Sequence, residues 1–436
     1  MAFRDTVGSR LGGCDMPERE ALSVTVTTTH VVLVPGFFGF GRLGELTYFA
    51  GVKPLLQARL AEAGLDARVV EVTTAPTASI RRRAASVVEA IAAVAAEGGD
   101  VHVVGHSTGG LDARLAVAQT AALPTRARIA DYERIRSLVS VSCPHFGTNV
   151  STYFTRPLGR AVFRLGARYL SFILRRRRFP LKLLLRLGYF VVRIRDPLRR
   201  HRGTFEQLYE RLLNDLSEER RLELAQFLEQ VSQEQALLFQ LTPAGCDLLN
   251  ACTADPPLAY GSVISCAPTP RFKTLLRSML NLYTQLMYPV YWVLHRLARE
   301  PNDALRQQFA EAQLTALDSG LGRRALGSDT DGVVPVLSQV WGRVLHVAHG
   351  DHLDVVGQYG APGSEGDPND RSWGGDWLPS ASGFDRAAFE ALWSKVADFI
   401  VEASRHPRQI TKRDRESKEE EESGAATDRR SIEVFS

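Results

Sequence analysis

One serine in the chain stands where a nucleophile is expected. Residues 105–109 read Gly-His-Ser-Thr-Gly, which matches the pattern G-x-S-x-G. The expected buried strand Val101–Gly105 leads into the motif and the helical pattern Leu111–Ala122 follows it, so the serine falls at a strand–turn–helix junction. Flanking glycines allow the tight turn, and the N-terminus of the helix faces the developing negative charge. Ser107 is therefore the expected nucleophile; the alternative is a glycine-rich turn with an incidental serine.

A serine hydroxyl needs a base within hydrogen-bond reach and an acid that orients the base. After a serine in this kind of turn, the chain order is an acid and then a histidine. His352, in Gly350-Asp351-His352, is the expected base, and His349 is its rival. Asp331, in the segment TDGVVP, is the expected acid, and Asp329 is its rival. The alternatives are a surface-loop histidine and a solvated carboxylate in a turn.

The tetrahedral intermediate of acyl transfer needs two N–H donors for its oxyanion. Thr108, directly after the nucleophile, is expected to supply one backbone N–H. Phe37, which follows the apolar run His30–Pro35, is expected to supply the other. A second interpretation, in which Phe37, Phe38 and Phe40 line an apolar cleft, is compatible with the first because a backbone donor leaves the side chain free.

Strands and helices alternate around these residues. Continuous apolar runs predict strands that are buried on both faces, and helical patterns are bounded by Pro and Gly. The expected strands are 30–35, 68–72, 101–105, 136–143, 260–266 and 343–348, and the expected helices are 55–63, 79–96, 111–122 and 384–403. This alternation predicts an α/β fold with a mainly parallel sheet flanked by helices.

Five regions divide the 436 residues. Composition predicts an N-terminal lead-in at 1–24, the first half of an α/β core at 25–150, a helical basic cap insertion at 151–240, the second half of the core at 241–404 with a helical insert at 270–312, and a charged, disordered tail at 405–436. No internal repeat is apparent.

Five segments resemble the bacterial triacylglycerol lipases of the true-lipase family, which belong to the α/β-hydrolase superfamily. They are VPGFFGF at 34–40, GHSTGGLDAR at 105–114, SVSCPHFGT at 140–148, DGVV at 331–334 and HLDVVGQ at 352–358. The resemblance implies an α/β-hydrolase fold with large helical cap or lid insertions. It also implies Ser107, Asp331 and His352 as the catalytic triad, with Phe37 and Thr108 at the oxyanion hole.

The same resemblance raises the question of a calcium ion. In those lipases the Asp and the Gln of HLDxxxQ help to hold calcium beside the histidine loop, and the matching positions are Asp354 and Gln358. Calcium takes six to eight oxygen ligands. The second carboxylate of the family has no clear match, and Asp318 is only a guess. The alternative is that Asp354 forms hydrogen bonds within its own loop.

The cysteines and the N-terminal residues set this chain apart from secreted lipases. The odd number of cysteines lacks C-x-x-C or Cys/His spacing and indicates neither a disulfide framework nor a zinc site; they are Cys14, Cys143, Cys246, Cys252 and Cys266. Leu337 stands where the second cysteine of the family's disulfide is expected. Met1–Ser23 has no apolar run, so no secretory signal is expected and a cytoplasmic location is predicted.

The basic insertion suggests a lipid partner. Arginines recur every four residues from Arg156 to Arg168 and continue to Arg202, interleaved with apolar residues. Basic and apolar surface together suit peripheral contact with an anionic membrane, whereas the alternative is a cap whose arginines are solvated or paired with nearby glutamates. Ser278–Leu294 has no charge, yet polar residues and a proline interrupt it, so a lid or acyl-pocket wall is expected rather than a membrane span. The net charge of +4 does not point to nucleic acid.

These expectations combine into one function and its alternatives. The expected activity is that of a serine carboxylic-ester hydrolase, an esterase or lipase, which acts on lipid-like esters through an acyl-enzyme. No required cofactor is expected, and calcium is a possible ligand. A phospholipase, a polyester depolymerase or a lipid transacylase would use the same three residues. A non-enzymatic membrane-binding protein of the same fold is the alternative from another class.

Overall fold

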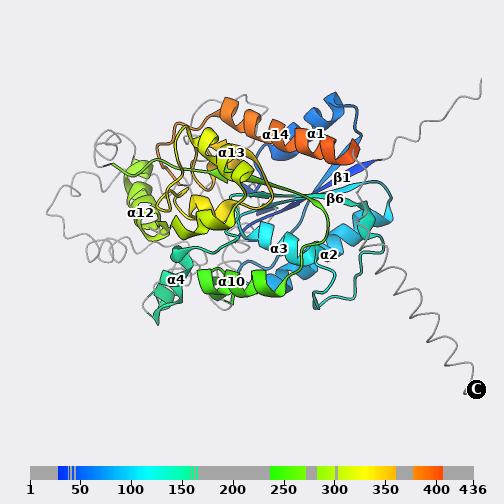
Figure 1. The fold of residues 1–436 in the computed structure, drawn as a ribbon, viewed down its shortest axis with the longest axis horizontal. Coiled ribbons are helices and arrows are strands. Elements are labelled where there is room, and N and C mark those ends of the chain that lie inside the picture. Colours follow the sequence, from blue (N-terminus) through cyan, green and yellow to red (C-terminus); the bar gives the residue numbers. More distant parts are fainter. Residues whose placement is uncertain are drawn as a thin grey trace, which may run out of the picture.

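A six-stranded parallel sheet lies at the centre of the molecule (Figure 1). The structure is a computed structural model, and it describes residues 28–37, 39, 42–43, 46–157, 159–161, 164, 236–271, 282–299, 303–359, 376 and 378–405. The strand order is β4-β1-β5-β6-β7-β8. Each neighbouring pair is parallel. In sheet order the strands are Ala67–Glu71, Thr29–Val34, Val101–His106, Ile135–Val141, Ala259–Ser265 and Arg343–Ala348. A short antiparallel pair, β2 (Arg42–Leu43) and β3 (Leu46–Thr47), follows β1.

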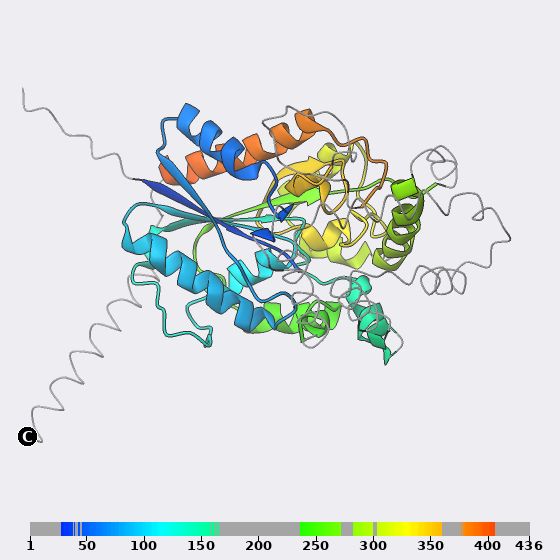
Figure 2. The same cartoon turned by 180° about the vertical axis from the view of Figure 1, so that it is seen from behind.

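Helices cover both faces of the sheet (Figures 1 and 2). One face carries α1 (Val52–Glu62) and α14 (Arg386–Arg405), and the other carries α2 (Ile80–Ala96) and α3 (Thr108–Val117). Alternate residues of β1 divide between these layers: Val31 and Leu33 pack with α1 and α14, whereas Val32 and Val34 pack with α2 and α3. The strand is therefore buried on both faces, which is why it has no polar–apolar alternation.

Five further α-helices are described outside these two pairs. They are α4 (Asn149–Thr155), α9 (Ala236–Gln240), α10 (Pro243–Cys252), α12 (Leu282–Ala298) and α13 (Glu311–Leu321). The turns η1 (Tyr132–Arg134), η4 (Asp303–Gln308), η5 (Val336–Gln339) and η6 (Asp354–Val356) complete the helical elements. Both α4 and α12 lie beyond one end of the sheet (Figure 1).

The observed fold confirms the expected fold class. A mainly parallel sheet between two helical layers, with the turn of Ser107 between β5 and α3, is the α/β-hydrolase fold. The expected strand at 136–143 was drawn too long: β6 ends at Val141, because Ser142 has a positive φ of 51° and leaves the extended conformation. The expected helix at 111–122 was also too long, since α3 ends at Val117 and Ala118 is extended.

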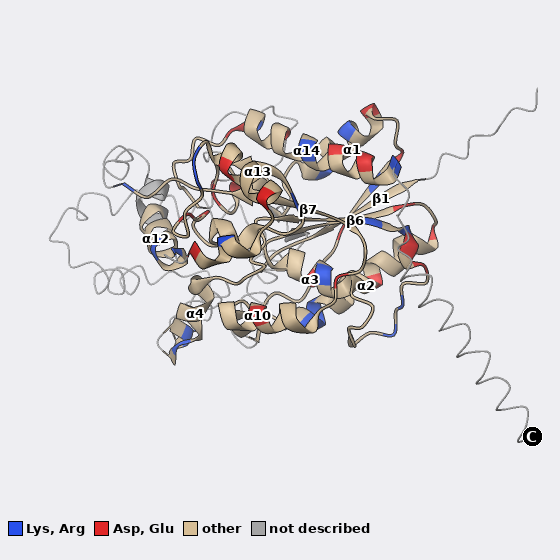
Figure 3. Ribbon diagram, viewed as in Figure 1, with Lys and Arg blue, Asp and Glu red and all other residues tan. Residues whose placement is uncertain are grey.

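Several predictions fall outside the described residues. They are the lead-in at 1–24, the tail at 406–436 and most of the basic insertion, whose residues 165–235 are not described. Of the first arginine series, Arg156, Arg160 and Arg164 are described. In the part of the chain that is described, positive and negative residues are interspersed over the helices and loops (Figure 3). Among these same residues, no helix has both the length and the apolar character that a membrane span requires.

Candidate active site

The turn after β5 places Ser107 in a strained conformation that its neighbours fix. Ser107 has φ 54° and ψ −130°, which side chains other than glycine rarely adopt. A Cβ at Gly105 would lie 2.4 Å from the Gly109 carbonyl oxygen, and a Cβ at Gly109 would lie 2.3 Å from the Val34 carbonyl oxygen. Both glycines are therefore required for strand, turn and helix to approach so closely. Ser107 stands at the N-terminus of α3, with 5% of its surface exposed.

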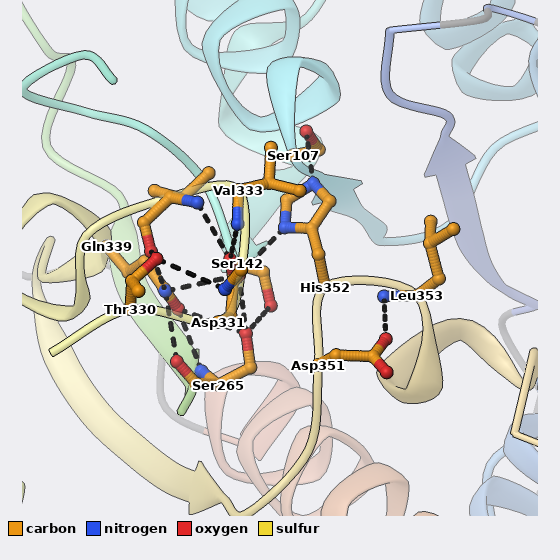
Figure 4. Close-up of polar contacts among 12 residues, drawn as sticks. Ser107, Ser142, Ser265, Thr330, Asp331, Val333, Gln339, Asp351, His352 and Leu353 are labelled. Carbon is orange, nitrogen blue, oxygen red and sulfur yellow. Dashed lines mark hydrogen bonds and ion pairs between the residues drawn. The ribbon is translucent and has the colours of Figure 1, made fainter. Parts of the chain in front are cut away.

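His352 joins this serine to an aspartate (Figure 4). The Nε2 atom of His352 lies 2.9 Å from Ser107 Oγ, and its Nδ1 atom lies 2.7 Å from Asp331 Oδ2. A carboxylate only accepts hydrogen bonds, so Nδ1 carries the proton and the lone pair of Nε2 faces the serine hydroxyl. This arrangement is the one in which a histidine accepts the proton of a serine. All three side chains are buried.

The structure brings the expected residues together and leaves their rivals elsewhere. His349 is exposed, and its Nε2 lies 3.1 Å from the Gly320 carbonyl oxygen. Asp329 pairs with Arg323 at 2.6 Å and 2.9 Å, and it also accepts a backbone hydrogen bond from Leu326. Among the described residues, neither rival has a hydrogen bond to Ser107 or His352.

Asp331 is held by groups that the sequence analysis missed (Figure 4). Its Oδ1 accepts hydrogen bonds from the backbone N–H of Val333 at 2.9 Å and of Val334 at 2.7 Å. Its Oδ2 accepts from Ser265 Oγ at 2.8 Å and from Gln339 Nε2 at 3.3 Å, in addition to His352. These donors satisfy both oxygens of a fully buried carboxylate and fix its direction. Ser265 is a polar residue at the carboxyl end of an apolar strand, but nothing in the sequence pairs it with Asp331, 66 positions later.

The loop after β1 runs against Ser107. A Cβ at Gly36 would lie 2.8 Å from the Cβ of Ser107, so residue 36 and the serine are in contact. Phe37 follows directly, and its ring is half-buried beside Ile80, Leu111 and other apolar residues. Both interpretations of Phe37 are therefore compatible with the structure. Phe38 and Phe40 lie outside the described residues.

A buried arginine on α2 supports this loop. Arg83 donates hydrogen bonds to the carbonyl oxygens of Pro35 at 2.9 Å and Gly36 at 2.7 Å. It also lies 3.3 Å from Thr108 Oγ1 and forms an ion pair with Asp112 at 2.8 Å. Burial raises the pKa of Asp112 to about 6, although the Arg83 guanidinium acts in the opposite direction. One guanidinium thus connects both segments that are expected to supply oxyanion donors.

An acidic cluster adjoins His352. Within the described chain, Asp351, Asp354 and Asp376 place carboxylate oxygens within 4.8 Å of one another. Asp354 Oδ2 accepts hydrogen bonds from the Asp351 backbone N–H at 2.9 Å and from Ser382 Oγ at 2.8 Å, so the expected bonding within the loop is present. Burial raises the pKa of Asp354 to about 6 and that of Asp376 to about 7. Asp376 Oδ1 is buried and has no hydrogen-bond partner.

The cluster fits a hard divalent cation, and it differs from the expected ligand set. Its donors are all oxygens, and a cation would offset the repulsion between buried carboxylates. Asp318 is not part of this cluster: Arg306 pairs with both of its oxygens, at 2.8 Å and 2.9 Å. The side-chain Nε2 of Gln358 donates to the Thr47 carbonyl oxygen at 2.9 Å, and its buried Oε1 has no hydrogen-bond partner.

One family model matches the segment that carries Ser107. Residues 73–172, which include β5, Ser107 and α3, match the family described as "Putative serine esterase (DUF676)". No curated protein matches the chain by sequence. Among solved structures, the chain is similar to the metagenomic carboxyl esterase MGS0156, with 17% identity, a TM-score of 0.45, and coverage of 90% of this chain and 82% of that one.

Two further solved structures are similar at the same level. EstA from Clostridium botulinum has 18% identity and a TM-score of 0.45, with 91% of this chain and 92% of that chain covered. The Staphylococcus hyicus lipase has 16% identity and a TM-score of 0.44, with 86% and 96% covered. Membership of the true-lipase family stays a prediction. The similarity to serine esterases falls on the segment that carries Ser107.

Proposed function

We propose that this protein is a serine carboxylic-ester hydrolase that acts on lipid-like esters through an acyl-enzyme. The observation that carries the proposal is the pair of contacts made by His352: 2.9 Å from Nε2 to Ser107 Oγ and 2.7 Å from Nδ1 to Asp331 Oδ2 (Figure 4). The match to a serine esterase family over the segment of Ser107 supports it.

The proposed reaction transfers an acyl group to water. His352 takes the proton of Ser107 as the hydroxyl oxygen attacks the ester carbonyl, and Asp331 stabilises the imidazolium that forms. The backbone N–H groups of Phe37 and Thr108 stabilise the oxyanion. His352 then protonates the leaving alcohol, and the acyl group remains on the serine. A water molecule, deprotonated by His352, attacks the acyl-enzyme and releases the acid.

Apolar surface near the acid supports a lipid-like substrate. On α12, Val290 is 43% exposed, Trp292 is 45% exposed and Val293 is 58% exposed. The opposite face of this helix packs towards the loop of Asp331: a Cβ at Gly332 would lie 2.8 Å from the Tyr291 ring. An exposed apolar face beside a catalytic loop suits substrates that gather at an interface. Contact of the Arg156–Arg202 stretch with anionic membrane stays a prediction.

Hydrolysis of p-nitrophenyl butyrate and p-nitrophenyl palmitate tests the proposal. We expect the parent to be active, and Ser107→Ala and His352→Ala to lose up to about a millionfold in kcat, because the triad acts as a unit. His349→Ala is the matched control and should keep the parent's rate. An active Ser107→Ala variant, or a parent that is inert with a lipid interface and calcium supplied, would contradict the enzyme proposal. A steady fall in kcat/KM with acyl length would contradict only its lipid-like part.

We also propose that Asp351, Asp354 and Asp376 bind calcium, which would stabilise the loop of His352 without taking part in a chemical step. Calcium should raise the melting temperature of the parent, because a ligand that binds only the folded state stabilises it. Asp376→Asn should abolish this shift, whereas Asp398→Asn, on the exposed surface of α14, should keep it. Equal melting temperatures in calcium and in a chelator would contradict the proposal.

A further inference from the structure

Two buried side chains outside the triad connect its parts. Tyr48, which follows β3, places its hydroxyl 2.7 Å from the Nδ1 atom of His106. The Nε2 atom of His106 lies 2.9 Å from the backbone carbonyl oxygen of His352. A Cβ at Gly36 would lie 2.4 Å from the Tyr48 hydroxyl oxygen. Burial raises the pKa of this hydroxyl, whereas the Gly36 backbone lowers it, as an N–H that donates to its oxygen would. Tyr48 is 7% exposed and His106 is fully buried, so water does not compete for these contacts.

The chemistry of the groups fixes the direction of each hydrogen bond. The His352 carbonyl can only accept, so Nε2 of His106 must carry a proton. Burial and the nearby His352 lower the pKa of His106 well below its ordinary value, so the ring is neutral and its Nδ1 is an acceptor. The Tyr48 hydroxyl must then donate to Nδ1, which leaves its oxygen to accept the N–H of Gly36. The result is a directed chain of hydrogen bonds, in which each group donates to the next from Gly36 through Tyr48 and His106 to the His352 carbonyl.

The two ends of this chain are the two halves of the candidate site. Gly36 contacts Ser107 and precedes Phe37, the expected oxyanion donor. At the other end, the chain holds the backbone of His352, whose ring accepts the serine proton. We propose that Tyr48 and His106 are positioning residues for acyl transfer. Through this directed chain of hydrogen bonds they fix the position of the oxyanion loop, residues 35–37, relative to His352. The inference rests on the proposed function.

Further contacts hold together the two segments that this chain of hydrogen bonds connects. Gln358 Nε2 donates to the carbonyl oxygens of Thr47 at 2.9 Å and Tyr48 at 3.4 Å. A Cβ at Gly357 would lie 2.0 Å from the Ala50 carbonyl oxygen, so the backbones of residues 47–50 and 352–358 are in close contact. A displacement of Tyr48 would therefore be transmitted to the loop that carries His352. Such displacements act on the geometry of the reacting groups more than on the binding of substrate.

Replacement of the Tyr48 hydroxyl gives a direct test. Tyr48→Phe keeps the ring but removes both the donor to His106 and the acceptor for Gly36. We expect kcat for p-nitrophenyl butyrate to fall by about ten- to a hundredfold with KM little changed, since misplacement by about 1 Å can cost a hundredfold. Tyr260→Phe is the matched control: it removes a hydroxyl that donates to the Pro256 carbonyl at 3.0 Å, at the amino end of β7, and should keep kcat.

A double-mutant cycle separates the chain from independent packing effects. His106→Gln keeps an N–H near the position of Nε2 but lacks the Nδ1 acceptor. If the chain acts as a unit, the double variant Tyr48→Phe/His106→Gln should be no slower than the slower single variant. A folded Tyr48→Phe with kcat within about twofold of the parent, or losses that multiply in the double variant, would overturn the inference.

A spectroscopic measurement keeps the inference testable even if the variants fail to fold. In parent protein with ¹⁵N-labelled histidine, His106 should remain the neutral Nε2–H tautomer from about pH 5 to pH 9, as the directed chain requires. Protonation of His106 in this range, or the Nδ1–H tautomer, would refute the chain. A parent that is inert towards esters would instead count against the proposed function, because the tautomer is observed without turnover.

Discussion

The proton on His352 is placed by one oxygen of Asp331. Oδ1 of Asp331 is occupied by two backbone N–H groups, which leaves Oδ2 to accept from His352 Nδ1 at 2.7 Å. An asparagine at this position would keep its carbonyl oxygen towards the backbone donors and turn its NH₂ group towards the histidine. Nδ1 would then have to accept, Nε2 would carry the proton, and the base could no longer take the proton of Ser107.

We therefore expect Asp331→Asn to lower kcat by about 10⁴ with little change in KM, because the ring is held in the wrong tautomer. The measurement is steady-state hydrolysis of a short p-nitrophenyl ester, with circular dichroism to check the fold. Asp329→Asn is the control, since Asp329 pairs with Arg323 and is not bonded to the histidine. Comparable losses in the two variants would mean that the acid has been assigned to the wrong residue.

Residue-level prediction was possible where the sequence itself displays a pattern. The turn of Ser107 and the chain order of acid and histidine are patterns that a single sequence displays. Ser265 and Tyr48 lacked such a pattern: Ser265 meets Asp331 across 66 positions, and Tyr48 meets His106 across 58. Only strand order and loop packing create these contacts, so composition and spacing did not reveal them.

At the scale of elements, helix α2 supports the loop that follows β1. Arg81, Arg82 and Arg83 are consecutive in the sequence, yet the phase of the helix exposes the first two and buries the third. The buried guanidinium donates to four carbonyl oxygens, two in residues 75–76 and two in residues 35–36. Helix periodicity predicted the helix. Which of the three arginines is buried depends on how the helix is rotated relative to the sheet, and the sequence alone does not give this rotation.

This support gives a second prediction. Arg83→Lys keeps a positive charge beside Asp112, but an ammonium group lacks the planar fork that reaches several acceptors together. We expect a folded protein whose kcat is at least about tenfold lower, because the oxyanion loop is less well fixed. Arg82→Lys, on the exposed side of the same helix, should match the parent in both kcat and melting temperature.

Arg83→Leu should behave differently from Arg83→Lys. It would leave the Asp112 carboxylate buried without its ion-pair partner, which costs about 3–5 kcal/mol of unfolding free energy. Urea denaturation of the two variants measures this difference. If Arg83→Lys retained the parent's kcat, the guanidinium would support the stability of the helix and not the geometry of the loop.

The elements themselves were largely predictable because the sheet is buried on both faces. A continuous apolar run such as Val31–Val34 has no alternation of polar and apolar residues that could be mistaken for a half-buried strand. The order of the strands was less accessible, since β5 lies beside β1 while β4, its predecessor in the chain, takes the edge. The acidic cluster shows the same limit: Asp376 joins Asp351 and Asp354 from a segment with no pattern in common with theirs.

At the scale of the whole molecule, buried histidines link stability to pH. The pKa values of His102, His106, His145 and His295 all lie below the ordinary value, and burial is the largest cause in each case. His102 joins two strands and the last helix, since its ring nitrogens lie 2.8 Å from Ser137 Oγ and 3.0 Å from Ser404 Oγ. The folded state excludes protons from such groups, whereas the unfolded chain binds them.

The sign of the effect follows from this difference. Burial lowers the pKa of His102 from 6.5 to about 3, so its contribution to stability is present above pH 6.5 and is lost as the pH falls from there towards 3. His102 alone should cost about 2 kcal/mol of unfolding free energy between about pH 7.5 and pH 5, at about 1.36 kcal/mol per pH unit. Urea denaturation near pH 7.5 and near pH 5 measures the total loss.

His102→Gln isolates one of these contributions. Glutamine does not titrate, so the variant should start less stable near pH 7.5 but lose about 2 kcal/mol less than the parent on transfer to pH 5. The exposed His349 provides the control, because His349→Gln removes a histidine from the chain without removing a buried ring. If the parent and His102→Gln lost the same unfolding free energy on transfer to pH 5, His102 would already bind a proton in the folded state. That result would contradict the low pKa that we attribute to its burial between the sheet and α14.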